Sequence, residues 1–326
     1  MKKLLAVATM LTISVACAQK SENVEFKSVP AEKKVEVYVG GKLFTNYIYP
    51  DNMEKQVLNP IYTASGIEIT RGYPLTPRAF ERTDHPHHVG HWFNFGDVNG
   101  LDFWNNSFAI PAERKDRYGT VKFVGIEKMD NAKGELVVKS NWTNNQNEIL
   151  LEEETTFIFG GDAQNRWFDR ISKLTAKTDV TFTQNKEGMV AIRMDRAFEE
   201  PSTKHEKFLD ANGIETDVPI MNSDGVNGVY HNAQGVQGGD VWAKRSEWVA
   251  LNATKGGENI TVAIIDNQGN PNYPAWSHAR GYGLFATNSM GGQAFDKEAE
   301  PVKLDLKPGE NVTFKYRIVI GVYSDD

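Results

Sequence analysis

Cysteine is nearly absent from this sequence of 326 residues, because Cys17 is the only one. A single cysteine cannot form a disulfide within the chain, so the hydrophobic core must supply the stability. Long apolar runs are missing after the N-terminal segment, and none approaches the ~20 residues that a transmembrane helix needs. We therefore expect no transmembrane span in the mature chain.

Basic clusters are missing as well. The formal net charge is -7, from 36 basic and 43 acidic residues. Phosphate backbones are bound by positive surfaces, so this balance argues against nucleic acid as a partner. Linkers rich in proline or serine and short-period repeats are also missing, so we expect a single domain over residues 19–326.

The first 18 residues have the pattern of an export signal. Lys2 and Lys3 precede an apolar stretch over residues 4–15, and the small residues Ala16 and Ala18 flank Cys17. Two interpretations of Cys17 stay open, lipidation in a lipoprotein or a place within an Ala-x-Ala cleavage site. Either one predicts a periplasmic or membrane-anchored protein.

Strand patterns run through most of the chain. Residues 35–39 and 42–49 alternate around Gly40-Gly41, which predicts a hairpin with a two-residue turn. Similar runs follow at 121–126, 135–142, 149–159, 168–174, 190–194 and 260–265, and a Pro-Gly turn separates two alternating runs within 302–320. Helical periodicity is scarce. The sequence therefore predicts an all-β protein, a large two-sheet β-sandwich.

The stretch 81–104 combines histidines with aromatic residues. Four of the seven histidines, His85, His87, His88 and His91, lie within seven positions. Imidazoles transfer protons, bind metals or recognise polar ligands, and aromatic side chains form walls for a ring-shaped ligand. A sugar fits this combination best.

Pro86 excludes a regular helix around these histidines, so they are expected on an extended or turning backbone. On a continuous strand, His85 and His87 would share one face and His88 would lie on the other, so at most half of the cluster could converge. The others would then be structural.

Two later regions carry further candidates. Around Arg245, alternation predicts either a surface ion pair with Glu247 or an arginine directed at a ligand. The stretch 265–285 is rich in glycine, asparagine and proline and is expected to be a loop. Its aromatic, imidazole and guanidinium groups could form a ligand wall, and we expect the loop from Tyr273 to Arg280 to share a pocket with His85–His91.

Several motifs together resemble a bacterial family of unknown function that often carries the label "methane oxygenase PmoA". They are Asp84–His88, Gly96–Gly100 with Asp102–Trp104, Lys186–Met189, Lys244–Trp248, and Gly269–Pro274 with His278–Gly281. The resemblance extends from about Val35 to the C-terminus. It departs at Val89-Gly90-His91 and at Phe95, where the family would have an Arg-Ser-Leu-like stretch and a histidine.

This PmoA-like family is similar to the galactose-mutarotase-like superfamily, whose β-supersandwiches bind sugars. The resemblance implies an exported carbohydrate-active protein. We expect an enzyme of epimerase, lyase or glycosidase type that uses histidine acid–base chemistry, and the alternative is a non-catalytic glycan-binding module of a polysaccharide-utilisation system. The candidate catalytic residues are His85, His87, His88, His278 and Arg280, and the candidate substrate-binding residues are Arg82, Asp84, Trp92, Asp97, Asn99, Trp104, Arg245, Asn270, Tyr273 and Tyr282.

A required cofactor is not expected. A divalent metal is the alternative, with His85 and His87 as ligands from one strand face and His278 as a third.

Overall fold

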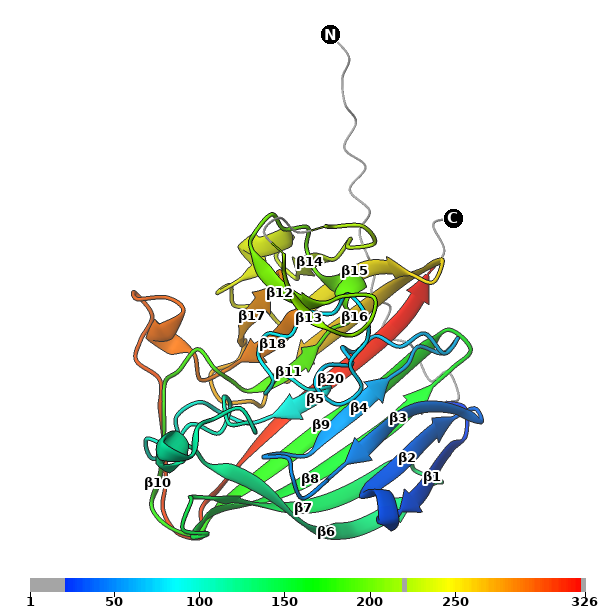
Figure 1. The fold of residues 1–326 in the computed structure, drawn as a ribbon. Helices are drawn as coiled ribbons and strands as arrows, with labels where there is room; N and C mark the ends of the chain where they lie inside the picture. The colour runs from blue at the N-terminus through cyan, green and yellow to red at the C-terminus, as the bar shows by residue number, and fades with distance from the viewer. Residues whose placement is uncertain (1–20, 219–221, 324–326) are drawn as a thin grey trace.

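The computed structural model describes residues 21–218 and 222–323, which form two eight-stranded antiparallel sheets (Figure 1). The signal segment and Cys17 lie outside the described residues. The first sheet has the order β1 (Val24–Val29), β2 (Lys34–Val39), β3 (Lys42–Ile48), β4 (Val57–Ile61), β5 (His91–Phe93), β11 (Val190–Arg193), β18 (Leu284–Asn288) and β17 (Trp276–Arg280). The second sheet has the order β14 (Val229–Asn232), β15 (Trp248–Lys255), β16 (Glu258–Asp266), β20 (Asn311–Tyr323), β9 (Asn165–Ala176), β8 (Ile149–Gly161), β7 (Glu135–Thr143) and β6 (Thr120–Asp130).

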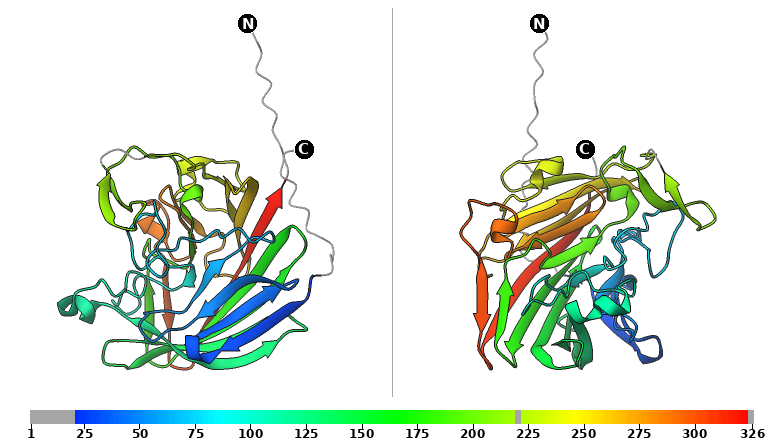
Figure 2. Two further views of the ribbon diagram at one scale, coloured as in Figure 1. Left: turned by 45° about the vertical axis from the view of Figure 1, so that its right-hand side comes forward. Right: turned by 60° about the vertical axis from the view of Figure 1, so that its left-hand side comes forward.

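Two short pairs and five short 3-10 helices complete the described structure. β10 (Val180–Thr183) pairs with β19 (Lys303–Leu306), and β12 (Glu206–Leu209) pairs with β13 (Glu215–Val218). The β12–β13 hairpin projects from the body of the molecule (Figure 2). The 3-10 helices are η1 (Pro30–Glu32), η2 (Ala112–Arg117), η3 (Arg196–Phe198), η4 (Gly238–Val241) and η5 (Gly292–Ala294). Within the described ranges, no helix is long and apolar enough to span a membrane.

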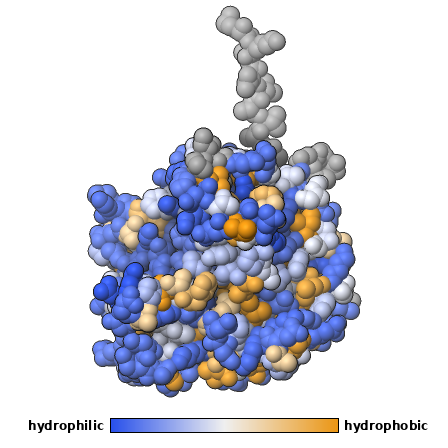
Figure 3. All heavy atoms as spheres, in the orientation of Figure 1, coloured by the Kyte–Doolittle hydropathy of each residue, from blue (hydrophilic) through white to orange (hydrophobic). Residues whose placement is uncertain are grey.

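The predicted all-β, two-sheet sandwich is confirmed. The two sheets pack through one hydrophobic core, in which Phe44 of β3 lies 6.0 Å from Phe159 of β8 and Phe93 of β5 lies 5.6 Å from Phe314 of β20, measured between ring centroids. In Figure 1 the red strand β20 lies beside the green strand β9, and β8 follows on the other side of β9, as the pairing requires. The face in Figure 3 is mainly hydrophilic, with apolar side chains in small groups.

The predicted hairpin is also confirmed. β2 and β3 are joined by Gly40 and Gly41, whose φ angles are +60° and +76°. Two consecutive positive φ angles are typical of the type I′ turn, which matches the twist of the strands that it joins, and glycine adopts them without steric cost.

The expected loop over 265–285 is shorter than predicted, because β17 occupies Trp276–Arg280 and β18 begins at Leu284. β17 is the edge strand of the first sheet, and its sequence lacks the run of apolar residues that is typical of a core strand. Polar side chains at His278 and Arg280 alternate with the core-facing Ala279, since one side of β17 faces a polar site and not the core.

Candidate functional site

The site lies on the outer face of the first sheet, where β5, β11, β18 and β17 are neighbours. The register pairs Trp92 with Ala191, Ala191 with Ala286, and Ala286 with His278. These four residues form one row on one face, and the two alanines between larger side chains leave a low floor.

The adjacent positions in each strand face the core instead. His91 precedes Trp92, and its ring packs 4.8 Å from Phe168 of the second sheet, measured between centroids. Ile192, Phe285 and Ala279 belong to the same core. Strand alternation therefore separates His91 from the other histidines of the cluster.

The other three histidines occupy a turn and not a strand, which corrects the expectation that at most half of the cluster could converge. The backbone N–H of His88 donates to the carbonyl of His85 at 2.9 Å, and His85 has a φ of +44°. Pro86 stands at the second position of this turn, which its fixed φ favours. The ring centroids of His85 and His88 are 4.8 Å apart, those of His87 and His88 4.3 Å, and those of His85 and His87 5.6 Å. We call residues 84–88 the histidine turn.

Two buried arginines hold the histidine turn. Arg71 donates to the carbonyl oxygens of Asp84, His85 and His88 at 2.9–3.0 Å, and to the carboxylate of Asp84 at 2.7 Å. Arg193 of β11 donates to the same carboxylate at 2.6 Å and lies 3.2 Å from Nδ1 of His88. These bonds fix both the backbone of the turn and the position of Asp84.

The arginines also determine the state of Asp84. Burial by itself would raise the pKa of this carboxyl, but Arg193, the hydrogen bond from His85 and Arg71 outweigh burial and hold the pKa well below its usual range. Asp84 is therefore ionised at neutral pH. Its Oδ2 lies 2.5 Å from Nδ1 of His85.

Hydrogen bonding assigns the proton of each imidazole. A carboxylate only accepts, so Nδ1 of His85 carries a proton and Nε2 of the neutral ring has a free lone pair. A guanidinium only donates, so Nδ1 of His88 accepts and its Nε2 carries the proton. The turn thus presents a proton acceptor at His85 beside a proton donor at His88.

Burial keeps three of the site histidines uncharged. It lowers the pKa of His87 to about 2 and that of His278 to about 3, and it lowers the pKa of His88 well below its usual value. Nearby cations act in the same direction, Lys55 on His87, Arg280 on His278 and Arg193 on His88. These imidazoles are neutral hydrogen-bonding groups at physiological pH.

Aromatic rings join the histidine turn to β17. Tyr282 stacks on His85 at 4.9 Å, and Trp92 stacks on His88 at 5.2 Å. Trp104 lies 6.1 Å from His88 and 6.3 Å from His278, so the two separate regions expected to share a pocket are brought together around one indole. Among the described residues, Nε2 of His87, Nε2 of His88 and Nε1 of both tryptophans are buried without a hydrogen-bond partner.

Glu187 is a site residue that the sequence reasoning missed. Its carboxylate lies 4.0 Å from Nδ1 of His278, and burial raises its pKa while Lys186 partly offsets this. Its only signal in the sequence was its place within the motif Lys186–Met189. Arg71 and Arg193 had no signal, because their partners are defined only by tertiary structure.

Several predicted binding residues have partners within the protein. Arg82 forms buried ion pairs with Glu199 and Glu206, at 2.6 and 3.1 Å. Arg245 donates to the carbonyls of Asn272 and Pro274, and Glu247 accepts from Gln234 in place of the expected ion pair with Arg245.

The remaining predicted binding residues lie in loops. Asp97 accepts from the backbone of Gly100, Asn99 bonds the backbone of Asp179 and Thr181, and Asn270 bonds Asp266 and the backbone of Lys315. The backbone N–H of Tyr273 donates to the carbonyl of Asn270. These contacts account for the local structure and leave the histidine turn as the centre of the candidate site.

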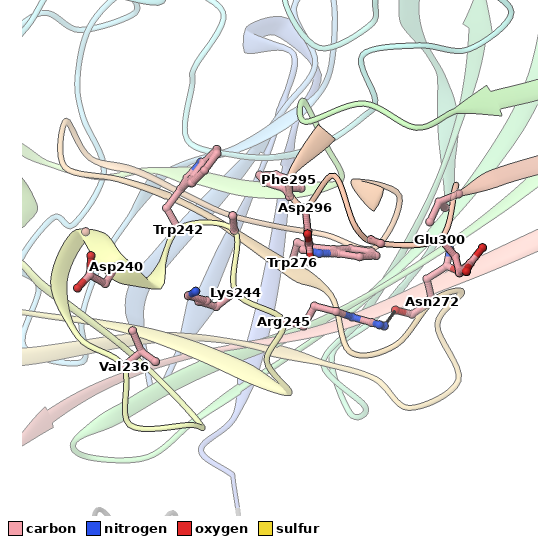
Figure 4. A pocket seen from close by; sticks show the side chains of 14 residues that line it. Val236, Asp240, Trp242, Lys244, Arg245, Asn272, Trp276, Phe295, Asp296 and Glu300 are labelled. Carbon is pink, nitrogen blue, oxygen red and sulfur yellow. Dashed lines mark hydrogen bonds between the residues drawn. The ribbon is translucent and has the colours of Figure 1, made fainter. Parts of the chain in front are cut away.

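Two cavities adjoin the site. The larger, of about 1060 Å³, includes Trp242, Lys244, Arg245, Trp276 and Phe295 in its lining (Figure 4). Its Trp242 and Phe295 contact the site directly, since Arg280 lies 5.6 Å from the Trp242 ring and Phe295 lies 5.6 Å from His278.

The smaller cavity, of about 390 Å³, is lined on its inner side by Lys55 and His87. In the described part of the chain, no three His, Cys, Asp or Glu side chains are arranged to hold a metal ion.

The fold and this site together define a β-sandwich protein with a histidine-rich polar site on the outer face of one sheet. The chain belongs to a family of unknown function, DUF6807, whose profile matches residues 34–322. That description does not contain the label "methane oxygenase PmoA", so the resemblance to the family with that label stays a prediction. No curated protein matches the chain.

Solved structures similar to this chain include sugar-related proteins at low identity. A galactose mutarotase-like protein from Clostridium acetobutylicum is 10% identical, with a TM-score of 0.35 over 93% of this chain and 100% of that protein. A galactose mutarotase-related enzyme from Lactobacillus acidophilus is 10% identical, with a TM-score of 0.33 over 92% and 97%. The galactosidase domain of the α-galactosidase-sucrose kinase AgaSK is 9% identical, with a TM-score of 0.38 over 92% and 42%.

Proposed function

We propose that this protein is an exported enzyme that acts on a sugar or oligosaccharide, with His85 as the general base. One observation carries the proposal: Asp84 fixes the proton of His85 on Nδ1, which leaves Nε2 free on a side chain that is 39% exposed. A base needs a free lone pair, a fixed orientation and access to substrate, and His85 has all three.

The proposed step is proton abstraction from a hydroxyl or an acidic C–H group of the sugar. The proton moves to Nε2 of His85, and the ionised Asp84 stabilises the imidazolium that forms. Arg280, which is exposed beside Tyr282 and Trp242, would hold developing negative charge.

This step uses protein groups only. The metal alternative, with His85, His87 and His278 as ligands, predicts near-stoichiometric metal in protein purified without chelator. Export, and lipidation at Cys17, rest on the pattern of the first 18 residues.

A glycan-binding module is the second candidate. It is favoured by the uncharged state of His87, His88 and His278, because neutral imidazoles and aromatic walls bind a sugar without any proton transfer. Its expected partner is the same carbohydrate.

The variant His85→Ala separates the two candidates. Wild-type protein is first tested for turnover and for binding, by product analysis and calorimetry, on a panel of neutral and acidic oligosaccharides. For an enzyme, the variant should lose about 10²-fold or more in kcat while the Kd changes by less than about threefold. Unchanged kcat would refute the role of His85, and binding without turnover in wild-type protein would favour the binding module.

The larger cavity is expected to bind the rest of an oligosaccharide. Trp242→Ala should raise KM about tenfold, or about 1.4 kcal/mol, for substrates long enough to reach the cavity, because the indole supplies a stacking face. KM for the shortest substrate should change less than about twofold. Steady-state kinetics on a chain-length series gives the comparison, with Trp167→Ala on β9 as the control. An equal effect on all lengths would contradict the assignment.

A further inference from the structure

Lys55 is a buried cation without a counterion. It lies two residues before β4 and is 4% exposed. Its Nζ lies 3.4 Å from the carbonyl oxygen of Trp104 and 5.4 Å from the centre of the Trp92 ring. Within the described residues, no carboxylate lies within 4.0 Å of this Nζ, and the neighbouring Glu54 pairs with Lys115 instead. Burial of an ammonium group without a paired anion is costly, so its persistence calls for a partner.

His87 lies in the same cavity as Lys55. Its Nε2 is buried and has no hydrogen-bond partner, and Lys55 is the strongest of the charges that keep the ring neutral. The ammonium of Lys55 therefore opposes protonation of His87 across the cavity. An anion between them would accept hydrogen bonds from both groups and would remove the repulsion.

Several other residues that line the cavity are apolar and are suited to pack against a sugar ring. Met53, Pro74, Pro86, Val89 and Phe108 supply apolar surface around the two polar groups. The His87 ring lies 5.6 Å from that of His85, so a ligand fixed at His87 is close to the proposed base. An anionic group in this cavity would thus place its sugar ring beside the catalytic position.

We propose that Lys55 and His87 bind the anionic group of an acidic sugar, a carboxylate or a sulfate ester, and so determine the substrate class. This inference rests on the proposed function, which it deepens. Acidic sugars are favoured over neutral ones because only an anion compensates the buried charge of Lys55.

The charge of Lys55 makes the expected binding depend on pH. Burial lowers the pKa of Lys55 to about 8, and the nearby Glu54 and Asp102 partly oppose this effect. The other charged groups around the cavity are Lys115 and, beyond His87, His85, Arg193 and Arg71. Lys55 is protonated below its pKa, so binding of an anion is present at neutral pH and is lost as the pH rises above about 8. Bound anion raises this pKa and shifts the loss upward.

The test compares wild-type protein with Lys55→Met in calorimetric titrations with glucuronate, glucose 6-sulfate and glucose. Methionine keeps the apolar length of lysine and removes the charge, and urea unfolding of the variant verifies its fold. Wild-type protein should bind at least one anionic sugar about tenfold or more tightly than glucose, and the variant should lose this preference while its affinity for glucose is unchanged. The two anionic ligands distinguish carboxylate from sulfate.

Lys177→Met is the matched control, because Lys177 pairs with Glu152 at the surface of the second sheet. It should leave all three affinities unchanged. Lys55→Arg should retain part of the preference, since it keeps the charge. If no anionic sugar distinguishes wild-type protein from Lys55→Met, the assignment is wrong, even where His85-dependent turnover of neutral sugars supports the enzyme. Lys55-dependent binding without turnover would instead uphold the assignment and overturn the enzyme.

Discussion

Replacing Arg193 with methionine is expected to lower the free energy of unfolding by about 3–5 kcal/mol, because one partner of a buried ion pair is removed. Arg193 is fully buried, and it is the residue that joins β11 to the histidine turn through Asp84 and His88. Its loss leaves the carboxylate of Asp84 with Arg71 as its one arginine partner. Urea denaturation followed by tryptophan fluorescence measures the change.

The matched control is Arg317→Met. Arg317 makes two hydrogen bonds to Asp169, at 2.6 and 2.7 Å, but its side chain is 53% exposed. Exposed pairs contribute about 1 kcal/mol or less, so this variant should be nearly as stable as wild-type protein. Equal losses in the two variants would show that the Arg193 pair has no special role in the fold.

The variant Asp84→Asn should reduce kcat about 10³- to 10⁴-fold, because it reverses the proton assignment of His85. Arg71 and Arg193 both donate to Oδ1, so the amide oxygen of asparagine must occupy that position and its NH₂ group must face His85. Nδ1 of His85 then accepts, the proton moves to Nε2, and the lone pair needed by a general base is lost. A pH–rate profile and the nitrogen chemical shifts of His85 report this change of tautomer.

Asp162→Asn serves as the control for Asp84→Asn. Asp162 accepts hydrogen bonds from the backbone of Gln164 and Asn165 in the turn between β8 and β9. Its replacement should leave kcat unchanged. An Asp84→Asn protein with wild-type kcat and an unaltered His85 tautomer would disprove the role of Asp84.

The sequence predicted six of the eight strands of the second sheet, all except β14 and β15, because their patterns are local. In β7 and β9, buried and less buried residues alternate along the chain, and this period of two is visible without any tertiary information. The residues of β17 were predicted to belong to a loop, because the outer face of this strand lies in the candidate site and carries polar side chains. Its alternation is therefore between polar and small residues.

The chemistry of the site depended on contacts that no pattern contains. The density of histidines drew attention to the stretch around which the candidate site is built, and the structure places the Trp104 ring close to both His88 and His278. The turn at Pro86 was not chosen over a strand, although proline is common at that position of a turn. The pairing of β5, β11, β18 and β17 brings Arg193 to the histidine turn and Glu187 to His278, and the order of these strands cannot be read from their sequences.

That strand order also determines when the site can form. The neighbours β6, β7, β8 and β9 are consecutive in the chain, so their hairpins close over short loops. The pairing of β5 with β11 and of β11 with β18 must instead close loops that reach from His91 to Arg193 and on to Asn288. Loop closure of this length is slow, and we infer that a nascent chain holds a partly folded second sheet before it holds any binding site. The candidate site is therefore completed only late in folding, after the chain has been made at least as far as β18.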